Sequence, residues 1–216
     1  MWQREGVRDE GTREGGAAAV VIGERFAWAH LPKAGGSATQ ELFRIFPELI
    51  VFADPDDTND KHALFRDRAE MIRGKLLAMN LRRLPFWVLS RAQHAADEGV
   101  WPEYKPIPMD SPQKLSESSF PDTRIALFTD EGRIRIDRWL RMERLADDFL
   151  HFVSELTDVD DERRRRVAEL GPVNLRSYDH EVDNWFTREQ VKRMYERNPN
   201  WARLEREIYG DLYEPA

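Results

Sequence analysis

A short polar stretch, "HLPKAGGSATQ" at residues 30–40, follows an apolar segment and combines a lysine, two glycines and hydroxyl side chains. A helix that begins after two glycines presents unpaired backbone N–H groups and the positive end of its dipole, and glycine lets an anion approach the backbone closely. Lys33 adds a positive charge, and Ser37 and Thr39 add hydroxyl groups in the first helical turn. The chemistry that this stretch predicts is binding of a phosphate or a similar anion.

The order of the residues distinguishes this loop from the phosphate loop of magnesium-dependent kinases. A Walker loop has Lys and Ser/Thr directly after its last glycine, with the hydroxyl group on Mg²⁺. In this chain Lys33 comes before Gly35 and Gly36. Taken by itself, the glycine pair is equally well explained by a tight connection between a strand and a helix, with Lys33 on the surface.

The elements that must position this loop alternate between strands and helices. The segment 25–31 has the apolar and aromatic composition of a strand and ends at Pro32. Apolar residues at helical spacing then follow until Pro47. A second strand is predicted at 49–53, and a charged helical stretch is predicted at about 63–73. This alternation is typical of α/β proteins.

The alternation continues toward the middle of the chain. A third strand is predicted at 75–83, followed by a helix over roughly 85–97 that begins with proline. Residues 99–122 contain five prolines and predict a long loop or lid. The stretch 124–137 predicts a hairpin across Asp-Glu-Gly, and apolar spacing from 140 to 156 predicts a long amphipathic helix. We therefore expect an α/β fold with a mostly parallel sheet and a helical C-terminal part.

Composition indicates one domain. With 216 residues, of which 41% are apolar, the chain has enough apolar side chains for a single core over residues 19–216. Residues 1–18 are rich in glycine and charge, which predicts a flexible tail. The apolar run at 17–23 is too short for a membrane span, and we expect a soluble, cytoplasmic protein.

Charge and residue types exclude several functions. The formal net charge of −7 gives none of the basic excess that binds phosphate backbones, so a nucleic-acid partner is not expected. The chain has 0 cysteines, which excludes a disulfide framework, a thiolate zinc site and a cysteine nucleophile.

The stretch "HLPKAGGSA" resembles the phosphosulfate-binding loop of the sulfotransferases that use 3′-phosphoadenosine 5′-phosphosulfate (PAPS), and their carbohydrate-type branch is the most similar. This resemblance implies a P-loop-like three-layer fold, PAPS as the donor, a hydroxyl acceptor such as a carbohydrate or small molecule, and no metal ion. It also implies that Lys33 is catalytic, because the family's lysine contacts the leaving bridging oxygen. The residues that the resemblance assigns to the phosphosulfate are Lys33, Ala34, Gly35, Gly36, Ser37 and Ala38. Ala38 departs from the family's Ser/Thr and can offer only its backbone N–H.

A second stretch, "LRRLPFWVLS" at 81–90, resembles the family's 3′-phosphate motif, in which an Arg ends a strand and a Ser follows eight residues later. Arg82 has that spacing to Ser90, whereas Arg83 has the family's Arg-x-Pro pattern and reaches Ser90 in seven residues. Both arginines remain candidates, and Arg82 is favoured. A guanidinium fork and a hydroxyl group suit a phosphate. Two further segments, at 127–156 and 174–210, resemble the family in order, mostly at packing positions.

The resemblance implies a general base just after the second strand, where this chain has His62. An imidazole with a pKa near 6.5 suits proton abstraction from a hydroxyl group. A solvated loop histidine explains the same residue equally well, and Asp60 and Glu70 are carboxylate alternatives. Two other functions stay open for the chain: a kinase-like phosphotransferase and a noncatalytic nucleotide-binding relative.

Overall fold

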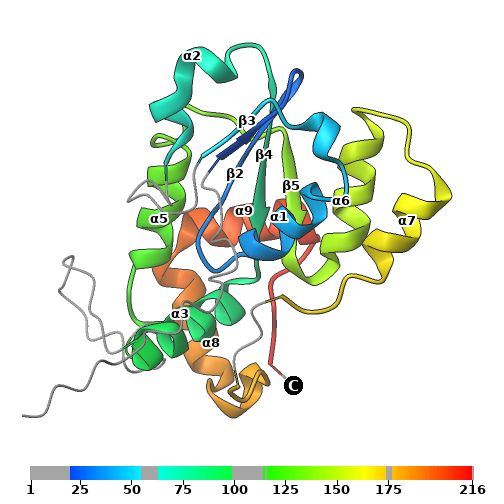
Figure 1. The fold of residues 1–216 in the computed structure, drawn as a ribbon. Coiled ribbons are helices and arrows are strands. Elements are labelled where there is room, and N and C mark those ends of the chain that lie inside the picture. Colours follow the sequence, from blue (N-terminus) through cyan, green and yellow to red (C-terminus); the bar gives the residue numbers. More distant parts are fainter. Residues whose placement is uncertain (1–19, 55–62, 99–113, 115, 174–176, 216) are drawn as a thin grey trace, which may run out of the picture.

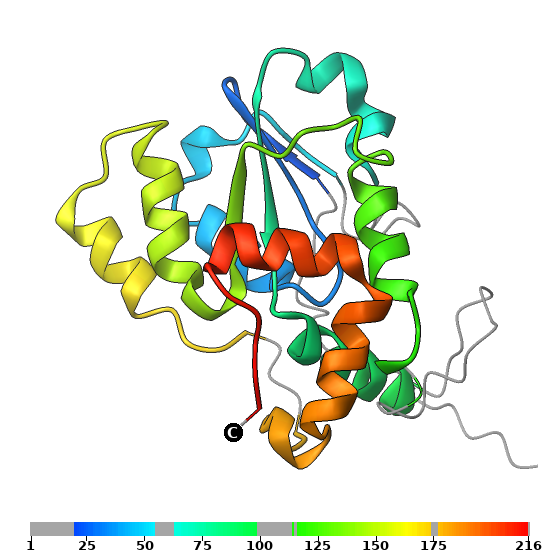
Figure 2. The ribbon, with the colours of Figure 1, turned by 180° about the vertical axis from the view of Figure 1, so that it is seen from behind.

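The structure of the protein is a computed structural model, drawn from two sides in Figures 1 and 2. It describes residues 20–54, 63–98, 114, 116–173 and 177–215. The predicted tail at 1–18, His62 and most of the predicted lid lie outside the described residues. Within the described ranges the fold is α/β, as predicted, with one five-stranded sheet.

The sheet is mixed, with strand order β3-β1-β2-β4-β5. Its strands are β1 (Val20–Ile22), β2 (Phe26–Ala29), β3 (Phe52–Ala53), β4 (Leu76–Leu81) and β5 (Arg138–Arg141). β4 pairs in parallel with β2 and β5, whereas β1 pairs antiparallel with β2 and β3. The mostly parallel sheet that we expected is therefore not confirmed. The reason is β1, a strand that the sequence analysis did not predict, which joins β2 through a tight turn at residues 23–25.

Helices pack on both faces of the sheet, because side chains of each strand alternate between the faces. Phe26 and Trp28 of β2 lie in one core cluster, and Ala27 and Ala29 lie in the other. The first cluster is covered by α1 (Gly36–Phe43), α6 (Leu145–Ser154) and α7 (Asp161–Ala168). The second is covered by α3 (Leu84–Glu98), α5 (Phe120–Phe128), α8 (Arg188–Arg197) and α9 (Pro199–Tyr209). α2 (Ala69–Ile72) is a single turn, and four 3₁₀ turns occur among the described residues, at Pro47–Leu49, Phe65–Arg68, Met142–Arg144 and Val182–Asn184.

The predicted hairpin at 124–137 is wrong. Its first half belongs to α5, in which Ile125 and Phe128 both face the core at helical spacing. Asp-Glu-Gly forms the turn after this helix, with positive φ values of 48° at Asp130 and 55° at Glu131. The predicted helix at 140–156 is shorter than expected, because its first residues belong to β5 and a 3₁₀ turn.

One edge of the sheet gathers the ends of several strands. β2, β4 and β5 are parallel, so the segments that follow them leave the sheet at the same edge. β3 runs in the same direction, because both β3 and β2 are antiparallel to β1. We call this the carboxyl edge; α1 lies beside it in Figure 1, while α2 lies at the opposite edge. None of the helices in the described part of the chain combines the length and apolar composition that crossing a bilayer requires.

Candidate functional site

The loop between β2 and α1 (residues 30–35) contains two residues with a left-handed backbone. Lys33 has a φ of 66°, which is unusual for a residue other than glycine, and Gly35 has a φ of 93°. Gly35 is the N-cap of α1, it gives no side-chain cap, and the first turn of the helix contains no acidic residue. The first N–H groups of α1 therefore have no capping side chain, and no carboxylate of this turn repels an anion.

Side chains also lie close to both glycines of the pair, so an added Cβ would force a neighbour to move. A Cβ atom on Gly35 would lie 2.1 Å from the Met142 sulfur, and one on Gly36 would lie 2.0 Å from the His30 ring. His30 in turn stacks on Trp28 with ring centroids 6.0 Å apart. The tight-connection explanation of the glycines is thus physically sound, and it is compatible with anion binding at the same turn.

A buried hydrogen-bond chain fixes the loop to the sheet. The Trp28 Nε1–H donates to Asn80 Oδ1 at 2.6 Å, and the Asn80 amide donates to Thr39 Oγ1 at 2.8 Å. Thr39 then donates to the carbonyl oxygen of Gly35 at 3.1 Å. The sequence analysis did not single out Asn80, although a polar residue inside the apolar run "LLAMNL" was an available signal.

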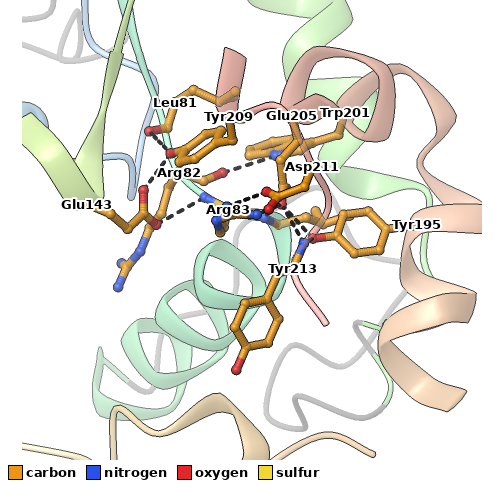
Figure 3. A network of polar contacts seen from close by, with 11 residues as sticks. Leu81, Arg82, Arg83, Glu143, Tyr195, Trp201, Glu205, Tyr209, Asp211 and Tyr213 are labelled. Atoms are coloured by element: carbon orange, nitrogen blue, oxygen red, sulfur yellow. Dashed lines mark hydrogen bonds and ion pairs between the residues drawn. The ribbon is translucent and has the colours of Figure 1, made fainter. Parts of the chain in front are cut away.

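The two candidate arginines, which directly follow β4, have different environments. Arg83 forms ion pairs with Glu205 at 3.2 Å and Asp211 at 2.6 Å, and it lies over the Tyr209 ring. The Arg82 guanidinium has no ion pair or hydrogen bond within the residues that the structure describes, and Figure 3 shows it directed away from Asp211. Of the two, Arg82 is the one available to a ligand.

Ser90 lies on α3, one turn beyond Trp87, and is half-buried. The Trp87 Nε1–H donates to the carbonyl oxygen of Pro32 at 2.7 Å, which joins α3 to the loop. The loop, Arg82 and the first half of α3 therefore lie at the same edge of the sheet.

Of the three candidates for the general base, the structure describes only Glu70. His62 and Asp60 lie outside the described residues. Glu70 lies in α2, is ion-paired with Arg73 at 2.7 Å and is strongly exposed. Because α2 precedes β4 whereas Arg82 follows it, the length of the strand, about 20 Å for six residues, separates Glu70 from the carboxyl edge.

Asp54 is a carboxylate at the carboxyl edge that the sequence analysis did not single out. It directly follows β3, and its side chain is fully buried. Its Oδ1 accepts hydrogen bonds from Arg68 Nε and Nη2 at 3.2 and 2.6 Å, while Oδ2 accepts none from the described residues.

The candidate site thus consists of the loop, with Lys33 and the N-terminus of α1, and Arg82 on the neighbouring strand end. A grouping of three or more His, Asp or Glu side chains suited to a metal ion is not found in the described ranges. Comparison of the chain with protein-family models, with curated proteins and with solved structures found no match in any of the three.

Proposed function

We propose that the protein is a sulfotransferase that moves the sulfuryl group of PAPS to a hydroxyl group of a carbohydrate or small-molecule acceptor. The observation that carries this proposal is the position of Arg82, whose guanidinium has no partner among the described residues. It follows β4, the parallel neighbour of the strand β2 that leads into the glycine loop. Two anion-binding features at one edge suit a donor with two phosphate-bearing positions. A P-loop-like arrangement, with the loop between a central strand and α1, is part of the proposal.

The proposed donor contacts follow from the chemistry of each group. The N–H groups of the loop and of the first turn of α1 bind the 5′-phosphosulfate, with the Ser37 hydroxyl and the Ala38 N–H at its rim. The Arg82 guanidinium binds the 3′-phosphate with its planar fork, and the Ser90 hydroxyl adds a hydrogen bond. Arg83 is assigned to the protein scaffold, because Glu205 and Asp211 already occupy it.

The proposed reaction is an in-line displacement at sulfur. The acceptor oxygen forms the new S–O bond, and the bond from sulfur to the bridging oxygen breaks, so 3′-phosphoadenosine 5′-phosphate leaves with the electron pair. Lys33 stabilises the negative charge that develops on the bridging oxygen. His62 takes the proton of the acceptor hydroxyl group.

Ligand binding and transfer of labelled sulfate test the proposal together. We expect calorimetry to detect 3′-phosphoadenosine 5′-phosphate, and labelled PAPS to transfer sulfate to at least one member of a panel of acceptors. Lys33→Ala should abolish transfer. The matched control is Lys75→Ala, which removes a lysine that binds Gly23 and Glu24 carbonyl oxygens at the opposite edge and should leave transfer unchanged.

Each alternative has its own outcome in these experiments. Binding of magnesium-ATP in place of the bisphosphate would favour a kinase-like phosphotransferase, and bisphosphate binding without transfer would favour a noncatalytic relative. Within the proposal, His62→Ala should lower turnover about a hundredfold while leaving nucleotide affinity unchanged. Unchanged turnover of this variant would remove His62 from the mechanism and direct the search to Asp54 and Asp60.

A further inference from the structure

The turn that joins β4 to α3 (residues 81–84) is held by one face of α9. Three side chains of α9 reach it, and their spacing of four residues places them on the same side of the helix. They are Trp201, Glu205 and Tyr209. Figure 3 shows these side chains converging on the turn, while the Arg82 side chain leaves it in another direction.

The contacts fix the backbone on both sides of Arg82. The Trp201 Nε1–H donates to the Arg82 carbonyl oxygen at 3.1 Å, and Glu205 Oε2 accepts the Leu84 N–H at 2.8 Å. On the other side, the Tyr209 hydroxyl lies 3.1 Å from the Leu81 carbonyl oxygen. Hydrogen bonds to successive peptide groups leave the turn little freedom to rotate.

Glu143 closes the same network from the end of β5. One of its carboxylate oxygens accepts the Arg83 N–H at 3.2 Å, and the other accepts the hydroxyl group of Tyr209. The turn is thus held by carboxylates from two directions, and Arg83 neutralises the one that is buried.

Glu205 is a costly residue for a merely structural role, because its side chain is fully buried. Burial raises its pKa, and the donors around it oppose that effect. Its Oε1 accepts from Arg83, from the Tyr195 hydroxyl at 2.7 Å and from the Tyr213 N–H. With these acceptor positions filled, Glu205 does not compete with a ligand for Arg82.

We propose that Glu205 and Tyr209 are positioning residues for the 3′-phosphate of the donor. They hold the turn so that Arg83 faces the protein and the guanidinium of Arg82 faces the ligand. This inference rests on the proposed function, since it assigns the determinants of affinity for one group of the same donor.

A pair of nucleotides that differ only in the 3′-phosphate separates positioning from general stability. Affinities for 3′-phosphoadenosine 5′-phosphate and for adenosine 5′-phosphate are measured by calorimetry on the full chain. Tyr209→Phe should weaken the bisphosphate about threefold to tenfold, the range of one lost hydrogen bond, and leave adenosine 5′-phosphate unchanged. Tyr213→Phe is the matched control, because its hydroxyl group binds Asp183 at 2.6 Å, away from the turn, and both affinities should persist.

A double-mutant cycle makes the test specific to Arg82. Once Arg82→Ala has removed the guanidinium, Tyr209→Phe should cause no further loss of bisphosphate affinity. Equal losses for both nucleotides, or a full further loss in the Arg82→Ala background, would overturn the positioning role and leave the proposed function standing. Glu205→Gln provides a second variant, with the same selective loss expected. A wild-type protein that fails to bind the bisphosphate would overturn both proposals.

Discussion

Two turns at the carboxyl edge differ in how they are built. The loop after β2 is shaped by positive φ values and by glycines that fit against Met142 and His30. The turn after β4 is shaped by charged and polar side chains from α9 and β5. The first leaves backbone N–H groups at the helix start without a capping side chain, and the second leaves a whole guanidinium without a partner among the described residues.

In each turn, the polar groups that do not help to hold the backbone stay available to a ligand. The loop after β2 is held by hydrogen bonds to its carbonyl oxygens, at Pro32 and Gly35, so the N–H groups at the start of α1 stay available. In the turn after β4, side chains hydrogen-bond to the backbone groups, and Arg83 is ion-paired with two of the surrounding carboxylates. Arg82 is therefore the arginine that stays available. Substitutions should therefore act through electrostatics in the turn after β4 and through steric fit in the loop.

The largest effect is expected for Glu205→Ala, which breaks the turn after β4. The variant leaves Arg83 and the Leu84 N–H without their buried acceptor, and we expect a loss of about 3–5 kcal/mol in the free energy of unfolding. Urea denaturation measures this loss. Glu207→Ala is the control, because Glu207 is exposed and pairs with Arg203 on the outer face of the same helix. Similar losses for both variants would show that the turn is not held by Glu205.

We expect Arg83 to contribute mainly to stability and Arg82 mainly to ligand binding. Arg83→Ala should reduce the free energy of unfolding by about 2 kcal/mol, because it leaves Glu205 and Asp211 without their cation. Arg82→Ala should change it by less than about 0.5 kcal/mol, as for a surface substitution, and should weaken the bisphosphate instead. Parallel denaturation and calorimetry on the two variants would contradict the comparison if Arg82 proved the more stabilising residue.

A smaller effect is expected in the loop. Gly36→Ala should destabilise the protein by about 1–2 kcal/mol, because its Cβ would clash with the His30 ring. Gly171→Ala, with no atom within 4 Å of the added Cβ, is the control. Combining Gly36→Ala with His30→Ala should relieve the clash, so the double variant should lose less stability than the sum of the two single ones. Thermal denaturation of the four variants provides this comparison.

The smallest effect is expected for the partly exposed ion pair between Arg138 and Glu155, which lies outside both turns. The hydrogen bond from Arg138 lowers the pKa of Glu155, so its ionised form contributes stability above the unfolded pKa, and that stability is lost as the pH falls through the folded pKa. Solvent screening limits the contribution to about 1 kcal/mol or less. Arg138→Gln should slightly reduce the loss of unfolding free energy that occurs as the pH falls. Denaturation at pH values from 3 to 6 measures this dependence. If Arg138→Gln changed the free energy of unfolding as much as Glu205→Ala does, the turn after β4 would not be specially dependent on its charges.

Local patterns predicted the elements around the site well. The strand before the loop and the strand and helix around Arg82 occur within about two residues of their predicted bounds, whereas the helix after the loop ends at Phe43, short of its predicted end at Pro47. Apolar spacing and glycine or proline boundaries determine these elements locally. The predicted hairpin at 124–137 was wrong because a sequence such as Asp-Glu-Gly can form the turn after a helix as readily as the turn of a hairpin.

Contacts between residues that are far apart in the chain could not be predicted from the sequence. Spacing to Ser90 could not separate Arg82 from Arg83, because the partners of Arg83 lie more than 120 residues away in the chain. Asn80 stands out as a polar residue in an apolar strand, but its contact with the loop depends on the fold, as does the contact of Glu205 with the turn.

The left-handed backbone of Lys33 has a consequence for laboratory evolution of this protein. A residue with a Cβ in that conformation costs about 1–2 kcal/mol relative to a right-handed one, and glycine avoids the cost. A selection for heat resistance alone would therefore favour Lys33→Gly and discard the ammonium group of this side chain. Libraries screened for thermostability should hold this codon fixed, or they will enrich robust proteins that have lost their cation.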